Sequence, residues 1–375
     1  MITIEMIDTE SSKQVGEFIE FHYDLYTGTP NWTPPFRNDL RMMLNRKKHP
    51  FYEHSDGDYF LAKKEGKTVG RIGVLVNKPF NEYHNKKKAQ FYFFDSIDDQ
   101  EIANALIDAA GKWATARGLT ELVGAKGLSA FDGYGILVEG FEHHQMMNTM
   151  NYNFPYYQRL FETAGFVKEN DFVSCYLDPN TFKLPEKMNL IAEKVLAKGK
   201  YKIKTFNSKK EIMKWALQIG KAYNDTFINN WEYYPLSERE VAYVKDNILA
   251  FADPKLIKLI TYEDKIIGFL LGFPDVSQAM LRSKGRLTPW GIIDLMREMK
   301  KTKWISLNGL GVLPDYQGTG GNVLMYVEML KTIKDYGFEH AELTQMADTA
   351  TRVRSDLVTI GVQVYKVHRI FSKVL

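Results

Sequence analysis

Cysteine is almost absent from this sequence, because Cys175 is the only one among 375 residues. A single thiol excludes a disulfide within the chain and leaves no cysteine–histidine spacing that would predict a metal site. Cys175 stands in an alternating apolar stretch, residues 172–177, so we expect a buried structural thiol rather than a nucleophile. We therefore predict no metal in the protein.

Long apolar runs and strong net charge are missing as well. No stretch of about 18 apolar residues occurs, and the first residues lack the pattern of a signal peptide, so we expect a cytoplasmic protein without a membrane partner. The net charge of +3 is too small to predict nucleic-acid binding, and we interpret the basic runs 46–48 and 86–88 as solvated loops. With 45% hydrophobic residues, the chain can bury the cores of a globular protein.

Glycine is concentrated between two apolar stretches near the end of the chain. Residues 304–313 have the pattern of a buried strand, and residues 323–336 have the spacing of an amphipathic helix followed by Gly337. Between them lies Gln317–Asn322, which reads Gln-Gly-Thr-Gly-Gly-Asn. Glycines let a backbone approach a phosphate, and the first N–H groups of the helix would point at it. This order of elements predicts an anion site.

Two common phosphate motifs do not fit this glycine turn. A Walker A loop ends in Gly-Lys followed by Ser or Thr, and here Gly320 is followed by Gly321 and Asn322. A dinucleotide fingerprint requires three glycines spaced G-x-G-x-x-G, which Gly318, Gly320 and Gly321 do not provide.

The two halves of the sequence repeat one order of elements. An alternating strand, a helix, an aromatic loop and a hairpin follow one another from residue 2 and again from residue 201. Asn31-Trp32 precedes Asn230-Trp231 by 199 positions, and Gly70 precedes Gly268 by 198. A nearly constant offset indicates a duplication. We predict two tandem domains, residues 1–178 and 201–375, joined by a linker at 179–200.

The full order of elements in each half resembles the fold of the GNAT (GCN5-related N-acetyltransferase) superfamily. The glycine turn is similar to the pyrophosphate loop of that superfamily, in which Gln or Arg precedes a central glycine by three positions, after a strand that ends Val-x-Pro. Val312 and Pro314, then Gln317 and Gly320, match this pattern, whereas Asn322 replaces a Gly or Ala. The resemblance implies an α/β fold of two tandem GNAT-like domains, each a mixed, mostly antiparallel sheet flanked by helices.

A second motif and the paired loops extend the resemblance over nearly the whole chain. Residues 156–166 are similar to the late helix of the superfamily, with Phe161 in place of its tyrosine. The length and the paired Asn-Trp loops resemble a bacterial tandem group of that superfamily. The resemblance implies that acetyl-CoA, or another acyl-CoA, binds at the end of the strand and at the glycine turn, which are Gly311, Val312, Leu313, Gln317, Gly318, Thr319, Gly320, Gly321 and Asn322.

The first half differs at the position of this loop. Gly118 and Gly337 lie 219 positions apart, and this offset aligns residues 98–103 with Gln317–Asn322. The first half has no glycine there and places Asp95, Asp98, Asp99 and Glu101 at the expected helix start, where acids cap a helix but repel a pyrophosphate. We expect that the first half has lost CoA binding and serves as a structural or substrate-shaping partner. A cation held by these acids is the alternative.

Acyl transfer to an amine also needs a base, because an ammonium group has a pKa of about 10. Glu342 is the predicted base, Ser306 could hold a water in relay, and Tyr365 is the nearest substitute for the superfamily's late-helix tyrosine, which is absent near Leu357. The resemblance places the acceptor at the aromatic loop formed by Trp231, Glu232, Tyr233 and Tyr234.

Our hypothesis is an N-acetyltransferase, or a related acyltransferase, that uses a small-molecule or peptide amine. Two alternatives stay open. An aminoacyltransferase of the Fem type also pairs two GNAT-like domains, but this sequence shows neither its long helical hairpin nor a basic face. A CoA-binding sensor without turnover is favoured by Asn322 and by the absent tyrosine.

Overall fold

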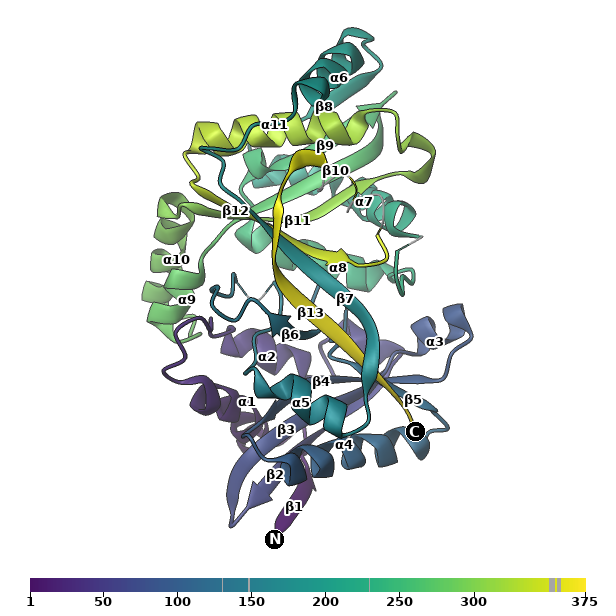
Figure 1. Ribbon diagram of the computed structural model, residues 1–375, viewed down its shortest axis with the longest axis vertical. Coiled ribbons are helices and arrows are strands. Elements are labelled where there is room, and N and C mark those ends of the chain that lie inside the picture. The colour runs from purple at the N-terminus through teal and green to yellow at the C-terminus, as the bar shows by residue number, and fades with distance from the viewer. Residues whose placement is uncertain (130, 148, 229, 351–354, 356–358) are drawn as a thin grey trace. The chain divides into compact units, whose positions relative to one another are not determined.

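The computed structural model describes residues 1–375 except 130, 148, 229, 351–354 and 356–358 (Figure 1). The chain forms two compact units, which we describe separately. The first contains residues 1–173, 276–296 and 365–375, and the second contains 174–275 and 297–364. The predicted domain boundaries stay a prediction, although residues 186–197 of the expected linker form a helix. The predicted helix over residues 352–360 falls largely outside the described residues.

Among its described residues, the first unit contains six strands and six α-helices that lie wholly within it. They are β1 (Ile2–Met6), α1 (Ser12–Tyr26), α2 (Arg37–Met43), β2 (Asp56–Lys64), β3 (Lys67–Val76), α3 (Lys78–His84), β4 (Lys88–Ser96), α4 (Gln100–Thr115), β5 (Glu121–Gly124), β6 (Ile136–Glu139), α5 (Tyr156–Thr163) and α9 (Ser277–Ser283). Three further elements contain a unit boundary: β7 (Val167–Leu177), α10 (Pro289–Lys301) and β13 (Gln363–Val374).

The sheet of the first unit has the order β1-β2-β3-β4-β5-β13, and β6 also pairs with β13. All of these pairs are antiparallel except β4–β5. Side chains alternate along β2, so that Phe60 and Ala62 pack with α4 on one face while Tyr59 and Leu61 pack with α1 on the other. The unit therefore has a core on each side of its sheet.

The second unit repeats this construction. Its elements are α6 (Glu186–Ala197), β8 (Tyr201–Lys204), α7 (Lys209–Phe227), α8 (Glu238–Phe251), β9 (Ile257–Tyr262), β10 (Lys265–Pro274), β11 (Trp304–Val312), α11 (Gly321–Tyr336) and β12 (His340–Ala347). The strand order is β7-β12-β11-β10-β9-β8. Helix α11 packs on one core, and α7 packs on another together with Phe269. Figure 1 shows α11 lying across this sheet.

The predicted fold class is confirmed, and the repeat extends to local detail. Helices α1 and α7 both begin at a serine, Ser11 or Ser208, whose side chain accepts a hydrogen bond from the backbone three residues later. Strands β4 and β11 each have nine residues, and in each the sixth residue, Phe93 or Gly309, has a positive φ. Cys175 is buried, as predicted. Sequence reasoning missed α3, α8 and α9.

Candidate functional site

Two parallel strands separate in the second unit beside the glycine turn. Within the described residues, the β11–β12 ladder runs from Trp304–His340 to Leu307–Leu343, whereas β11 continues to Val312 and β12 to Ala347. On its other side β11 stays paired with β10 up to Gly268–Val312. The backbone of residues 308–312 therefore has one edge that β12 does not pair. Such an edge has N–H and C=O groups available for a ligand.

The glycine turn continues directly from this strand. A short 3-10 turn over Pro314–Tyr316 is followed by Gly318 and Gly320, which have φ of +77° and +91°. The Gln317 side chain donates from Nε2 to the carbonyl of Val312, at 3.2 Å, and thereby holds the turn against the strand. No side chain of the described residues caps α11 at Gly320. The cap position of α11 therefore supplies no side-chain acceptor, which is an arrangement that suits an anion, and the anion site itself stays a prediction.

Helix α6 contacts the glycine turn from outside. A Cβ atom added to Gly320 would lie 2.8 Å from Cγ2 of Val195 and 3.2 Å from Cγ2 of Ile191. Glycine is thus required at this position both by the positive φ and by the close approach of α6. A Cβ atom added to Gly318 would meet no neighbour, so only its φ of +77° favours glycine there, and Thr319 is exposed. Sequence reasoning assigned α6 to a linker and missed this contact.

Two of the predicted catalytic residues meet in the second unit. Ser306 and Glu342 are paired in the β11–β12 ladder, so their side chains are neighbours on one face of the sheet. Both are buried, with exposed fractions of 0% and 1%. Among the described residues Ser306 Oγ has no hydrogen-bond partner. The third, Tyr365, groups with the first unit, where its ring lies 4.7 Å from that of His143. Its role stays a prediction.

The predicted acceptor loop follows the last turn of α7. Trp231, Glu232, Tyr233 and Tyr234 are all partly exposed, and the backbone N–H of Tyr233 donates to the carbonyl of Asn230 at 3.1 Å. Thr226 in the last turn of α7 lies so close to Gly311 that a Cβ atom added there would meet its methyl group. The helix that leads into the loop therefore packs on the strand that is expected to hold the cofactor.

The corresponding turn of the first unit is shorter and acidic. Only residues 97–99 separate β4 from α4, whereas residues 313–320 separate β11 from α11. The Asp99 carboxylate accepts hydrogen bonds from the backbone N–H groups of Glu101 and Ile102, at 3.0 and 3.4 Å. A carboxylate thus occupies the anion position at the start of α4, which supports the expected loss of CoA binding there.

Asp95 is not at a helix start, contrary to our prediction, because β4 continues to Ser96. Its carboxylate is buried and binds the guanidinium of Arg71 at 2.7 Å and Nδ1 of His22 at 2.9 Å. The hydroxyl groups of Tyr26 and Tyr157 also donate to it, at 3.0 and 3.3 Å. Sequence reasoning missed this buried cluster, because its five members come from α1, β3, β4 and α5 and share no spacing.

The charges of the buried cluster compensate one another. Burial raises the pKa of Asp95, but the positive charge of Arg71 and the hydrogen bonds from Arg71 and His22 outweigh it and lower the pKa overall. Burial lowers the pKa of His22, which favours the neutral imidazole. With Nδ1 held by a carboxylate, an imidazole can act as a base through Nε2. The cluster is therefore a second candidate site.

The positions of Asp95 and Arg71 in the first unit correspond to Gly311 and Phe269 in the second unit. Asp95 and Gly311 are each the eighth residue of their strand, β4 or β11. Arg71 and Phe269 each follow the glycine of the repeated hairpin. A Cβ atom on Gly311 would come within 2.9 Å of the Phe269 ring. The two units have therefore diverged where the strands separate, one toward buried charge and one toward glycine and apolar groups.

No protein-family model matches the chain. Among curated proteins it is 24% identical to Protein YghO of Escherichia coli over 364 residues, which covers 95% of this chain and 92% of that protein. It is also 24% identical to a bacterial ceramide synthase of Caulobacter vibrioides over 379 residues, which covers 99% and 98%.

Solved structures have the same fold. A tandem GNAT protein from the clavulanic acid biosynthesis pathway matches with a TM-score of 0.55 and 11% identity, over 100% of this chain and 98% of that chain. A GCN5-related N-acetyltransferase from Sphaerobacter thermophilus matches with a TM-score of 0.52 and 12% identity, over 100% and 95%. The chain thus has the GNAT fold, and the predicted resemblance in fold is confirmed.

Two further features were sought in the described part of the chain. It contains no group of three or more histidine, cysteine, aspartate or glutamate side chains placed to hold a metal ion. None of its helices combines the length and the apolar character needed to cross a membrane.

Proposed function

We propose that the protein transfers an acyl group from acyl-CoA to a primary amine, which forms an amide and releases CoA. The observation that carries this proposal is the separation of β11 from β12 directly before a glycine turn whose helix has no side-chain cap. This pairing of an open strand edge with an open helix N-terminus suits a ligand that joins a pyrophosphate to an amide-containing arm. Gln317–Asn322 would bind the pyrophosphate, and the backbone of Gly311–Leu313 would bind the arm and the thioester.

The proposed reaction needs a proton to leave the amine and a proton to reach the thiolate. The amine nitrogen attacks the thioester carbonyl, the carbon–sulfur bond breaks, and the sulfur leaves as a thiolate that is then protonated. Glu342 would accept the amine proton, directly or through a water held by Ser306, since the two residues are adjacent and buried. The backbone N–H groups of β11 would stabilise the developing oxyanion.

The acceptor in this proposal is the amine of a long-chain amino alcohol. The observation that favours it is the likeness to a bacterial ceramide synthase over almost the full length of both chains. A ceramide is the amide of such an amino alcohol, so the bond formed is the one that the fold is suited to form. Trp231, Tyr233 and Tyr234 supply partly exposed aromatic surface for an apolar chain. A small polar amine remains the competing acceptor, and acetyl-CoA and long-chain acyl-CoA are both tested as donors.

The donor site can be tested by calorimetric titration of acetyl-CoA, palmitoyl-CoA, CoA and ATP. Thr319→Glu places a carboxylate in the exposed part of the glycine turn without disturbing the contact of α6, which Gly320→Glu would disrupt. We expect Thr319→Glu to weaken binding at least about tenfold, since a like charge within a few ångströms of a pyrophosphate costs more than about 1.4 kcal/mol. Thr319→Gln is the matched control. Equal affinities of the two variants would refute the site.

Turnover is measured separately as CoA release with an amine screen that includes sphinganine and small amines. Glu342→Gln is expected to lower kcat by about a hundredfold while the affinity for acyl-CoA stays unchanged. His22→Gln tests the second candidate site. A loss of turnover in His22→Gln but not in Glu342→Gln would place the chemistry in the first unit. Binding of acyl-CoA without release of CoA for any amine would favour a sensor.

A further inference from the structure

Helix α10 is a surface helix without a single buried residue. Its most exposed apolar side chains are Trp290 and Met296, with exposed fractions of 80% and 58%, and Ile292 and Ile293 follow with 47% and 41%. An amphipathic helix of a globular protein normally turns its apolar residues toward the core. Here they face outward, which indicates that this side of α10 is covered by a partner.

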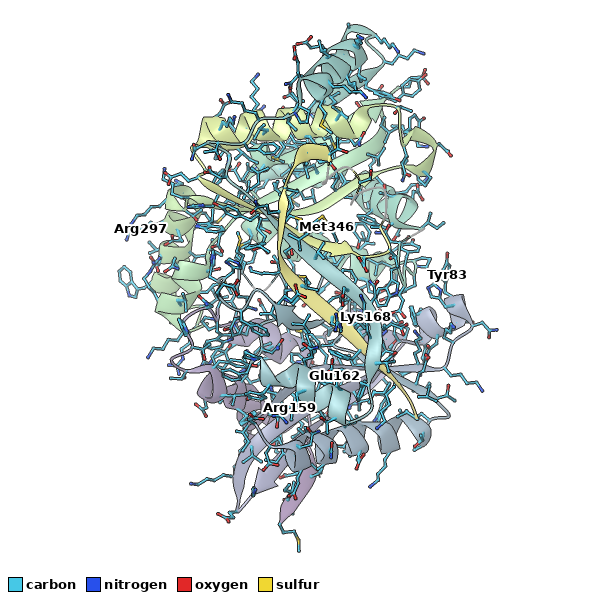
Figure 2. All side chains as sticks on the ribbon, in the orientation of Figure 1. Tyr83, Arg159, Glu162, Lys168, Arg297 and Met346 are labelled. Carbon is cyan, nitrogen blue, oxygen red and sulfur yellow. The ribbon has the colours of Figure 1, made fainter. Side chains whose placement is uncertain are left out.

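The exposed side chains form two adjacent rows along the helix. One row contains Trp290, Ile293 and Arg297, and the other contains Ile292, Met296 and Lys300. The residues of each row are spaced three or four positions apart, as neighbours on one side of a helix are. Each row begins with apolar residues and ends with a cation, and Arg297 projects away from the α10 ribbon in Figure 2. Lys301 adds another exposed cation at this end. We refer to these seven residues as the outer face of α10.

One acidic residue, Asp294, lies beside the outer face, four positions after Trp290 and three before Arg297. Asp294 binds the guanidinium of Arg282 in α9 through both carboxylate oxygens, at 2.8 and 3.1 Å. Glu298 is only partly exposed. The outer face therefore combines four apolar side chains with three cations, and the Asp294 carboxylate beside it is bound to Arg282.

Residues 289–296 of α10 belong to the first unit, where α9 and the turn after it are held by several contacts. Ala279 and Met280 of α9 are buried, and Ser277 accepts a hydrogen bond from the N–H of Met147 at 2.8 Å. The carbonyl of Gly285, in the turn between α9 and α10, accepts from the N–H of Arg37 at 2.9 Å. The exposure of α10 is therefore a feature of a fixed hairpin rather than of a frayed end.

We propose that the outer face of α10 binds the surface of an anionic lipid bilayer. Apolar side chains enter the interface between headgroups and acyl chains, tryptophan favours that depth, and cations attract anionic headgroups. A helix of 13 residues is too short to span the bilayer, so α10 would lie in its plane. This proposal departs from the sequence expectation of no membrane partner, and it does not depend on the proposed acyl transfer.

A second copy of the chain is a less suitable occupant. Burial of the outer face against a protein would remove Arg297, Lys300 and Lys301 from water, although the Asp294 carboxylate beside them is already bound to Arg282. A bilayer surface leaves the same cations among phosphate groups and water. Self-association is therefore one of the outcomes that would overturn the proposal.

The test is flotation of the purified full chain, without acyl-CoA, on vesicles of phosphatidylcholine with or without phosphatidylglycerol. We expect binding to the anionic vesicles that weakens as the salt concentration rises. The variant Arg297→Gln/Lys300→Gln/Lys301→Gln should lose on the order of a hundredfold in partitioning, at about fivefold per cation. The charge-matched control Lys86→Gln/Lys87→Gln/Lys112→Gln removes three exposed cations elsewhere and should bind like the original protein.

Insertion is tested by tryptophan fluorescence. Trp290 is one of six tryptophans, and its 80% exposure predicts a blue shift when vesicles are added. Trp290→Phe should still bind but lose this shift, and Trp290→Glu should bind at least about tenfold more weakly. The proposal is overturned by equal binding to neutral and anionic vesicles, by unchanged binding of the triple variant, or by a dimer in sedimentation that Trp290→Glu dissociates.

Discussion

Removal of the Asp95 carboxylate should strongly destabilise the first unit. In Asp95→Ala, Arg71 keeps one hydrogen bond, from Nη1 to the carbonyl of Phe18 at 3.0 Å, and its side chain is only 3% exposed. A guanidinium cannot lose its proton, so the charge stays buried without a counterion. Breaking a buried ion pair in this way costs about 3–5 kcal/mol. For a unit of this size we expect a fall in Tm of roughly 6–20 °C.

Removal of the Arg71 guanidinium should lower the free energy of unfolding by less than removal of the Asp95 carboxylate, and this difference can be measured. In Arg71→Met the carboxylate of Asp95 keeps His22, Tyr26 and Tyr157 as partners, and either Asp95 or His22 can change its protonation to remove the charge. We expect Arg71→Met to cost about 1–2 kcal/mol less than Asp95→Ala, and the double variant to cost less than the sum of both.

The assay is equilibrium unfolding in urea followed by tryptophan fluorescence and circular dichroism, because the two units can unfold in separate transitions. A loss of less than about 1 kcal/mol in Asp95→Ala would refute the assignment of a buried ion pair. A larger loss in Arg71→Met than in Asp95→Ala would refute the reasoning about protonation. Asp98→Ala is a suitable control, since Asp98 is exposed and pairs only at the surface with Arg159.

The buried cluster also predicts the sign of a pH dependence. The lowered pKa of Asp95 means that the folded state binds this proton more weakly than the unfolded state does. Its contribution is therefore complete above the usual pKa of about 4 and is lost as the pH falls below that value. Burial lowers the pKa of His22 as well, so its contribution is complete above pH about 6.5 and declines below it.

Three further predictions follow from single residues. Burial lowers the pKa of His368 to about 3, so His368→Gln should make the free energy of unfolding less sensitive to pH between about 6.5 and 4. The measurement is urea unfolding at several pH values, and an unchanged slope of the unfolding free energy against pH would contradict the burial of a neutral imidazole. Gly320→Ala should destabilise the second unit by about 1–3 kcal/mol, because of its positive φ and its contact with Val195, and stability equal to the original protein would contradict this packing. Asp99→Ala should cost about 1 kcal/mol in helix capping and leave acyl-CoA affinity unchanged in calorimetry, whereas a clear loss of affinity would show that the first unit binds the donor.

Much of the fold could be predicted from the sequence because local signals agreed with the tertiary structure. Several features depend only on nearby residues. They are the glycines of the hairpins, the left-handed glycines after α4 and α11, and the alternation of more and less buried side chains along β1 and β8. The predicted glycine turn is present, with the 3-10 turn before it and α11 after it. Ser306 and Glu342 could be placed together because parallel strands with a helical crossover have a regular register.

What could not be predicted depends on contacts between distant parts of the chain. The segment of α6 reads as a linker, and only its packing on α11 shows that it borders the glycine turn. Asp95 reads as one of several acids before a helix, and only the three-dimensional arrangement joins it to Arg71 and His22. The spacing of residues along the sequence does not show contacts between distant residues, so motif analysis misses buried charge clusters of this kind.

The divergence of the two units at one strand position argues for a division of labour after duplication. A glycine at the eighth position of β11 lets Thr226 and Phe269 approach the strand, so that a methyl group and an aromatic ring fill the space that a side chain would take. The aspartate at the same position of β4 instead binds the Arg71 guanidinium, the His22 imidazole and the hydroxyl groups of Tyr26 and Tyr157, so a buried polar cluster fills the equivalent space. Strand β4 also continues beyond its pairing with β5, which ends at Phe91–Gly124, so at this position the two units differ in their side chains rather than in an open strand edge. The group that would repel a pyrophosphate in the first unit is therefore the Asp99 carboxylate at the start of α4 rather than the buried cluster.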